Sequence, residues 1–522
     1  MLQRAGLALV SGLLLSLAFE PVAFAYVIPV ALAGFALATR ELPVRRAWVP
    51  GLVFGVAFYF VHIYWMSDSI GPAAWIGLAG VEALFYGVLG AVSGALQRLP
   101  WWPAWLAAAW ASMELVRSGW PFSGMPWGRL AFGVVDTPVA DALVYVGMSG
   151  LSFLLALSGF LLAWAVTERE RRGRMVAVGA LVAVCAVMVV PALAPYHLDE
   201  RGSATVAVVQ GNIPPPENDI LADFRQVTEN HVQATVDLAS DVAEGSVPPP
   251  DFVLWPENST AVDPFGDATT NAGILRAADA IDVPILVGAI VDAGEQNVLN
   301  QGIVWDPETG AGERYTKHHP VAYGEYMPLR PMLRRLGIED QGQLGRIGRD
   351  MLSGTGDEPL RVGGVQVADA ICFDVAYDDV AYDQIENGAE LLAVQTSNAR
   401  FIFTDQIDQQ FAITRLRAIE SGKYLVVAST NGITGVVGPD GEVISSADPR
   451  TQEVLVEQVG LRPGVTPGVQ LGQWLGVLLP LLTVVGIALR VVTYRRDKRP
   501  ASTPGTAEPA LVGATEEKAS RD

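Results

Sequence analysis

The segment Val365-Gln-Val-Ala-Asp-Ala-Ile-Cys-Phe-Asp374 decides how the middle of this chain is interpreted. Its apolar, β-rich first part predicts a buried strand, and the strand ends at Cys372, one of only two cysteines among 522 residues. A thiol at the end of such a strand serves either packing or chemistry. Two segments that precede it in the sequence favour chemistry.

A carboxylate and an amine occupy similar positions after two other strand-like runs. Glu257 ends the run Leu254-Trp-Pro-Glu, and Lys317 ends Tyr315-Thr-Lys. Since a free thiol has a pKa of about 8.5, it needs a base or a cation nearby at neutral pH. Glu257 is the candidate base, and Lys317, with the backbone N–H after Cys372, is the candidate oxyanion stabiliser. The three side chains predict acyl transfer through a thioester.

Composition excludes several classes of function. The formal net charge is −20, whereas a nucleic-acid surface needs a basic footprint, so we expect no nucleic-acid partner. The second cysteine, Cys185, lies far from Cys372 in an apolar segment. Such a pair predicts neither a disulfide framework nor a metal site. We therefore expect a reaction without a metal or another cofactor.

Apolar residues are unevenly distributed along the chain and predict membrane spans, each of which needs about 20 apolar residues in a helix. Residues 1–25 also resemble a signal peptide, although Glu20-Pro21 favours the turn of a helical hairpin. The eight predicted spans are residues 5–19, 23–39, 47–66, 74–96, 101–117, 139–166, 175–194 and 472–491. The domains are then a transmembrane domain over 1–195, a catalytic domain over 196–470, a final transmembrane helix over 471–495 and a disordered tail over 496–522.

Basic residues predict the orientation of these spans, because loops rich in Lys and Arg stay in the cytoplasm. The predicted cytoplasmic segments carry Arg40, Arg45, Arg46, Arg98, Arg169, Arg171, Arg172, Arg174, Arg495, Arg496, Lys498 and Arg499. An even number of spans separates each of these segments from the next, so all of them fall on one side. The termini are then cytoplasmic, and the domain over 196–470 lies outside the cytoplasm.

An aromatic loop after the fifth span falls on the same outer face as that domain. It contains Trp120, Phe122 and Trp127, and such rings form either an aromatic belt at the headgroup level or a wall of a lipid-binding cleft. Glu114 and Arg117, three residues apart on the preceding helix, are expected to pair near the interface.

Strand-like and helical patterns alternate over residues 204–460, which is typical of layered α/β folds. Amphipathic helices are predicted over 221–242 and 405–421. The predicted strands are 204–210, 252–255, 284–291, 301–305, 365–372, 391–396 and 424–429.

Taken together, these motifs resemble the nitrilase superfamily, whose Glu-Lys-Cys triad lies in an α-β-β-α sandwich. More narrowly, residues 1–495 resemble the apolipoprotein N-acyltransferase family, which combines such a domain with membrane spans. The motifs that carry the resemblance are Gln210-Gly-Asn-Ile-Pro214, Trp255-Pro-Glu257, Lys317 with Gly324-Glu-Tyr-Met-Pro328, Cys372-Phe-Asp374, Arg415-Leu-Arg-Ala-Ile-Glu420, Ser429-Thr-Asn-Gly432 and the Trp120–Trp127 loop.

The resemblance implies a role for each site residue. Glu257 would be the general base, Lys317 the charge stabiliser and Cys372 the nucleophile. Supporting or substrate-binding roles would fall to Glu325, Phe373, Asp374, Asn300, Trp120 and Trp127. Asp374 stands where some relatives carry the longer Glu, and Pro214-Pro-Pro-Glu-Asn218 lacks a tryptophan that relatives carry there.

The resemblance also implies the reaction, the partners and the location. A phospholipid would give its acyl group to Cys372, and the thioester would acylate the N-terminal diacylglyceryl-cysteine of an apolipoprotein. The enzyme would be a multi-pass protein of the bacterial plasma membrane. Two alternatives stay open: a membrane-tethered amidase or nitrilase acting on a small soluble substrate, and a catalytically silent lipid-binding or scaffold protein.

Overall fold

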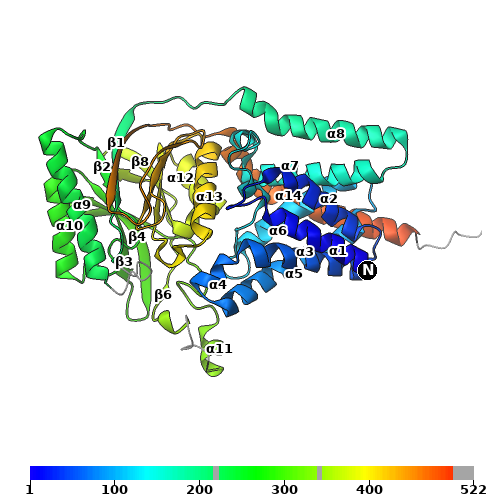
Figure 1. The fold of residues 1–522 in the computed structure, drawn as a ribbon, viewed down its shortest axis with the longest axis horizontal. Coiled ribbons are helices and arrows are strands. Elements are labelled where there is room, and N and C mark those ends of the chain that lie inside the picture. Colours follow the sequence, from blue (N-terminus) through cyan, green and yellow to red (C-terminus); the bar gives the residue numbers. More distant parts are fainter. Residues whose placement is uncertain (215–222, 338–343, 498–522) are drawn as a thin grey trace, which may run out of the picture.

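The computed structural model describes residues 1–214, 223–337 and 344–497, and it divides into a helical bundle and a β-sandwich (Figure 1). Residues 498–522, which make up most of the predicted tail, lie outside the described residues. Residues 215–218 of the proline-rich motif also lie outside them. The helices of the bundle are α1 (Leu2–Ser16), α2 (Ile28–Thr39), α3 (Val44–His62), α4 (Trp65–Ser69), α5 (Pro72–Leu96), α6 (Trp102–Gly119), α7 (Leu143–Thr167), α8 (Arg171–Val189) and α14 (Pro467–Asp497).

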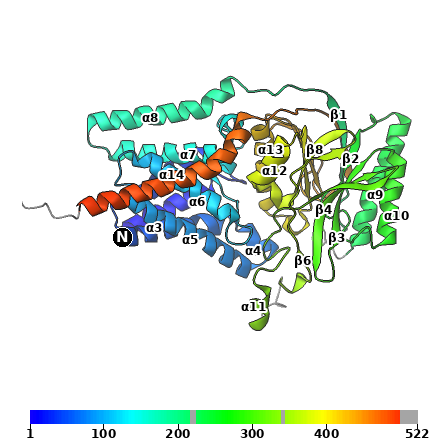
Figure 2. The ribbon, with the colours of Figure 1, turned by 180° about the vertical axis from the view of Figure 1, so that it is seen from behind.

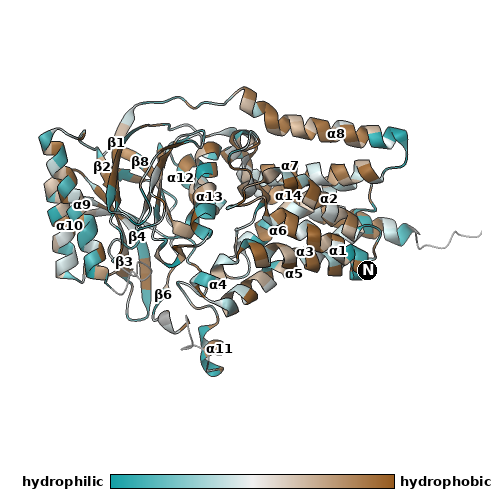
Figure 3. Ribbon diagram, in the orientation of Figure 1, coloured by the Kyte–Doolittle hydropathy of each residue, from teal (hydrophilic) through white to brown (hydrophobic). Residues whose placement is uncertain are grey.

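A helix lies at each of the eight places where a span was predicted. Apolar residues dominate most of the length of these helices (Figure 3), as expected of helices that face lipid or each other. Within the described ranges, five segments are long and apolar enough to cross a membrane: 44–62, 72–96, 140–167, 171–193 and 467–496. Two more, 2–16 and 25–39, are apolar but shorter. The count of eight spans stays a prediction.

Small residues allow close packing inside the bundle. A Cβ atom added to Gly51 of α3 would lie 2.4 Å from the carbonyl oxygen of Tyr86 and 2.8 Å from the Cα atom of Gly90, both on α5. Glycine at this crossing therefore lets the two backbones touch, which is how helices associate in an apolar solvent.

The sandwich consists of two sheets. In the first, the strand order is β13-β1-β2-β3-β4-β5, with β6 paired to β4; in the second it is β12-β11-β10-β9-β8-β7. The first sheet contains β1 (Ser203–Gln210), β2 (Phe252–Leu254), β3 (Ile285–Asp292), β4 (Asn297–Asp306), β5 (Gly310–Thr316), β6 (Asp350–Met351) and β13 (Glu453–Gly460). The second contains β7 (Leu360–Val362), β8 (Val365–Ile371), β9 (Leu391–Thr396), β10 (Leu425–Ser429), β11 (Gly435–Val437) and β12 (Val443–Ser446). All seven predicted strands are present.

Helices cover the outer face of each sheet, which gives the predicted α-β-β-α layers. Helices α9 (Phe224–Glu244) and α10 (Ala268–Ile281) pack on the first sheet through one apolar cluster. Helices α12 (Asp378–Glu386) and α13 (Gln406–Ser421) cover the second sheet and lie between it and the bundle (Figures 1 and 2). The short helix α11 (Arg330–Arg335) projects beside this junction.

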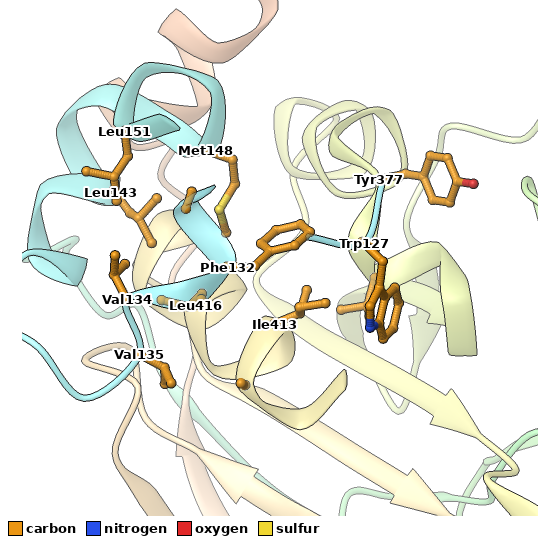
Figure 4. Packing of buried hydrophobic residues seen from close by; sticks show 14 of the residues in the cluster. Trp127, Phe132, Val134, Val135, Leu143, Met148, Leu151, Tyr377, Ile413 and Leu416 are labelled. Carbon is orange, nitrogen blue, oxygen red and sulfur yellow. The ribbon is translucent and has the colours of Figure 1, made fainter. Parts of the chain in front are cut away.

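The bundle and the sandwich share one continuous apolar core. Figure 4 shows Phe132 and Trp127, from the connection between α6 and α7, beside Ile413 and Leu416 of α13. All four side chains are nearly inaccessible to solvent. Because burial of apolar area is the main force in association, the two parts form one packed unit.

A buried ion network reinforces this junction. Arg129, before α7, donates to the two carboxylate oxygens of Asp378 at 2.8 and 3.0 Å. Arg417 of α13 donates to Oδ1 of Asp378 at 2.8 Å and to the backbone oxygen of Val375 at 2.9 Å. Both arginines are almost fully buried, so Asp378 lies between two cations that have little access to water.

We expect Asp378→Asn to lower the free energy of unfolding by about 3 kcal/mol, because the buried Arg129 loses its carboxylate partner and the buried Arg417 keeps only Glu420. Denaturant unfolding in detergent measures this. Glu229→Gln, which breaks a half-exposed pair with Arg276, is the control and should change stability by less than about 1 kcal/mol. Equal effects of the two substitutions would contradict a role for the network.

The lowered pKa of Asp378 also predicts how the stability of the protein depends on pH. Burial opposes ionisation of Asp378, but Arg129 and Arg417 outweigh it and lower the pKa to about 2. An unfolded Asp has a pKa of about 3.9. The stabilisation is therefore complete above pH ~4 and is lost as the pH falls toward 2, and Asp378→Asn should weaken this acid dependence.

Candidate active site

The three candidate catalytic residues come from the ends of strands in both sheets. Cys372 directly follows β8 and Lys317 directly follows β5, while Glu257 lies three residues beyond β2. Strands β1–β2–β3 and β8–β9–β10 are parallel within their sheets. Since ligand sites of α/β sheets form outside the carboxyl ends of parallel strands, the strand order brings together residues that are distant in sequence.

Glu257 is buried and fully hydrogen-bonded. Its Oε1 atom accepts from Asn300 Nδ2 at 2.8 Å and from Lys317 Nζ at 3.2 Å. Its Oε2 atom accepts from the backbone N–H of Ser397 at 2.9 Å. These donors fix the orientation of the carboxylate, as a general base requires.

Lys317 lies between two carboxylates. Its Nζ atom contacts Glu257 at 3.2 Å and Glu325 Oε1 at 2.7 Å, and its side chain has no solvent exposure. Burial by itself would lower the pKa of Lys317, but the charges of Glu257 and Glu325 outweigh it and raise the pKa well above its ordinary value. Lys317 is therefore a permanent cation rather than a base.

Cys372 begins a short 3-10 turn, Cys372–Ala376, with a φ angle of 54°. A non-glycine residue seldom occupies this left-handed region, and such strain is concentrated at functional sites. Burial, and then the negative charge of Glu257, raises the pKa of the thiol to about 12, while Lys317 and a hydrogen bond with Thr396 act in the opposite direction. The resting thiol is thus protonated, and its proton has to be removed by a base during the reaction.

Asn300 and Glu325 hold the two charged residues in place. Asn300 contacts Glu257 through its side chain, and its backbone oxygen accepts from the N–H of Lys317 at 2.9 Å. Glu325 binds Lys317, and its Oε2 atom accepts from the backbone N–H of Val321 at 2.8 Å. Both predicted supporting residues are therefore part of the cluster.

Asp374 is also buried, but it binds backbone groups that flank the lysine. Its carboxylate accepts from the hydroxyl of Tyr315 at 2.7 Å and from the N–H groups of His318 and His319 at 3.2 and 2.9 Å. A carboxylate shorter than Glu is thus long enough here. Asp374 ties the segment around Lys317 to the turn that begins at Cys372.

Two family profiles match this chain. The one described as "Apolipoprotein N-acyltransferase N-terminal domain" matches residues 11–161, in the bundle, and "Carbon-nitrogen hydrolase" matches residues 205–462, in the sandwich. An apolipoprotein N-acyltransferase of Mycolicibacterium smegmatis is 35% identical over 94% of this chain and 85% of its own length.

The chain belongs to the apolipoprotein N-acyltransferase family.

A second relative supports this family, and a solved structure with a similar domain is too distant to support it. A family member of Methylococcus capsulatus is 28% identical over 95% of this chain and 97% of its own length. An amidase from Nesterenkonia sp. of known crystal structure is 18% identical over 52% of this chain and 94% of its own chain. Its TM-score of 0.37 is too low to carry an argument.

The family's aromatic loop is divided between solvent and core. Trp120 is 64% exposed and contacts Phe85 edge to face, which agrees with a place at a membrane interface or cleft. Trp127 is 1% exposed, so a place in an aromatic belt is wrong for this residue. Its ring stacks on Phe373, with centroids 5.5 Å apart and planes 17° apart. Trp127 is buried because it packs against residues that are distant in the sequence, such as Phe373, and the local sequence pattern does not predict this contact.

The predicted pair of Glu114 and Arg117 is also wrong. Arg117 lies 3.5 Å from Glu82 of α5, and Glu114 accepts from the Trp110 indole and from the N–H of Leu130, both at 2.9 Å. Packing of α6 against α5 offered Arg117 a partner from another helix. A spacing of three residues permits a pair but does not decide it.

Several functional contacts had no signal in the sequence. The N–H of Ser397 is a backbone group, and Tyr315 reads as an ordinary strand residue, although its hydroxyl binds Asp374. Thr396, the last residue of β9, reaches the thiol only because β9 pairs with β8. Within the described part of the chain, no group of three or more His, Cys, Asp or Glu side chains is arranged to hold a metal ion.

Proposed function

We propose that this chain transfers an acyl group from a phospholipid to the N-terminal amino group of a diacylglyceryl-modified apolipoprotein, with Cys372 as the carrier. The observation that supports it most strongly is the cluster of buried Glu257 and Lys317 with the half-buried Cys372 in a member of this family. The packed union of the sandwich with the apolar bundle suits two substrates that are both anchored in lipid.

The first half-reaction forms the thioester. Glu257 takes the proton of the Cys372 thiol, and the sulfur attacks the ester carbonyl of the phospholipid. Lys317 Nζ stabilises the oxyanion. The intermediate then expels the lysophospholipid alkoxide, which receives the proton from Glu257. One C–S bond forms and one ester C–O bond breaks.

The second half-reaction forms an amide. The free amine of the lipoprotein attacks the thioester carbonyl, and Glu257 accepts its proton. A C–N bond forms, the C–S bond breaks, and Glu257 returns the proton to the sulfur of Cys372. An amide is more stable than a thioester or an ester, so the transfer proceeds forward. Exclusion of water from the thioester is necessary until the amine arrives.

We further propose that residues 196–470 lie outside the cytoplasm and that both ends of the chain lie in it. Arg4 and Arg98 bind backbone oxygens near Arg40, at Ala38 and Leu42, so basic residues gather at one end of the bundle. The start of α1 and the end of α14 lie at this end, and the sandwich lies at the other (Figures 1 and 2). The positive-inside rule then supports this orientation.

A phospholipid whose two acyl chains differ in mass tests this function. Incubation with the purified protein in micelles should add the mass of one fatty acid, less water, to the peptide that contains Cys372. A synthetic diacylglyceryl-cysteinyl peptide should then remove the adduct and gain the same mass, and an N-acetylated peptide should not. No adduct would contradict the proposal, and an adduct released only to water would indicate a hydrolase.

A further inference from the structure

Gln409 of α13 makes every hydrogen bond available to a carboxamide, and its partners all belong to the bundle. Its Oε1 atom accepts from the indole N–H groups of Trp65 and Trp127 at 3.0 and 2.8 Å. Its Nε2 atom donates to the backbone oxygens of Glu20 and His62 at 3.0 and 3.2 Å. The side chain is buried, so two donors and two lone pairs are satisfied without water.

These partners come from three different connections of the bundle. Glu20 lies between α1 and α2, His62 and Trp65 lie at the junction of α3 and α4, and Trp127 lies between α6 and α7. A single side chain of the sandwich therefore fixes three loops of the bundle relative to one another and to α13.

The same contacts lead to the nucleophile. Trp127 stacks on Phe373, the residue after Cys372, and Figure 4 shows the Trp127 ring beside Ile413 of α13. The neighbour of Gln409 on α13, Gln410, donates to Thr396 Oγ1 at 3.2 Å. Thr396 ends β9, which pairs with β8 up to Ile371, so Thr396 lies next to the Cys372 turn. Helix α13 thus contacts the bundle through Gln409, and through Gln410 it contacts Thr396, which lies beside the Cys372 turn.

We infer that Gln409 is a positioning residue: it holds Trp127, and through Phe373 it holds the Cys372 turn at the place where Glu257 can deprotonate the thiol. This inference rests on the function proposed above. An amide is required because the site presents two donors and two acceptors. A carboxylate would repel the two carbonyl oxygens, and an apolar side chain would leave four polar groups unpaired.

A double-mutant cycle on the rate constant of thioester formation tests the inference. A displacement of about 1 Å at a reacting group costs roughly 10²-fold in rate, so Gln409→Leu should slow acylation by about 10²-fold. Trp127→Phe keeps a ring on Phe373 but removes the indole N–H, and it should cost about tenfold. If both act through one bridge, the double variant is no slower than Gln409→Leu alone.

The pH profile separates positioning from a general loss of structure. A thiol displaced from Glu257 depends on its own ionisation, so the acylation rate of Gln409→Leu should rise with pH more steeply than that of the native protein. Lower stability alone would reduce the amount of active protein and leave this profile unchanged. Asp408→Asn, at the exposed neighbouring position of α13, is the control and should leave both readouts unchanged.

The possible outcomes are distinct. Multiplicative effects of the two substitutions, or a native rate and profile in Gln409→Leu, would overturn the role of Gln409. If Gln409→Leu does not fold, the rate and the pH profile of Trp127→Phe decide the question in the same way. Failure of the native protein to form a thioester would overturn the proposed function instead.

Discussion

Cys372→Ala is expected to abolish both the acyl adduct and the transfer, with a loss of at least about 10⁴-fold in rate. No step of the proposed cycle can proceed without the sulfur, and removal of the nucleophile in enzymes with covalent intermediates has effects of this size or larger. The fold should persist, because alanine has the same backbone preferences as cysteine at a φ of 54°. Intact-mass spectrometry after incubation with phospholipid measures the adduct, and acylation of the lipopeptide measures the transfer.

Cys185 provides a matched control for this substitution. It is the other cysteine of the chain and lies exposed on α8, in the bundle. Cys185→Ser should therefore retain the adduct and the transfer at native rates. Transfer that persists in Cys372→Ala would show that the acyl group travels by another route.

Glu257→Gln is expected to slow thioester formation by about 10³-fold, within the range that a positioned general base contributes. The glutamine keeps the size of the side chain but cannot accept the thiol proton. With a pKa of about 12 for Cys372, only a minute fraction of the thiol is ionised at neutral pH. A single-turnover measurement of the adduct with excess phospholipid isolates this step.

The pH dependence of the Glu257→Gln variant gives a second test of the same idea. Without a base, the rate follows the fraction of thiolate, which rises about tenfold per pH unit as long as the pH stays below the pKa. Loss of the Glu257 charge lowers the pKa of the thiol somewhat, but burial, the larger cause of its elevation, remains. The slope should therefore persist from pH 7 to 9, whereas that of the native protein should be shallower.

Glu442→Gln, at an exposed position of the sandwich, is the control for the loss of one carboxylate. It should leave the rate and its pH dependence unchanged. A Glu257→Gln variant with a native rate, or with a reduced rate that does not change with pH, would exclude Glu257 as the base.

Local sequence predicted the layered fold and the central cluster for a clear physical reason. Strands such as Val365–Ile371 and the long apolar helices can be predicted from the periodicity and composition of short stretches of sequence. The strands also determine where residues at their ends lie, such as Cys372 and Lys317. The order and direction of the strands then bring these ends together, so the cluster follows once the fold is right.

The tertiary structure alone decided the contacts that give these residues their properties. The inward place of Trp127, the pairing of Arg117 with Glu82 and the four bonds of Gln409 each join segments that are far apart in the chain. The elevated pKa of Cys372 depends on burial, which exists only after the layers have packed. Local sequence patterns do not predict such contacts. A buried polar group needs a hydrogen-bond partner, but several partners would serve, and only the packing of distant segments decides which one it meets.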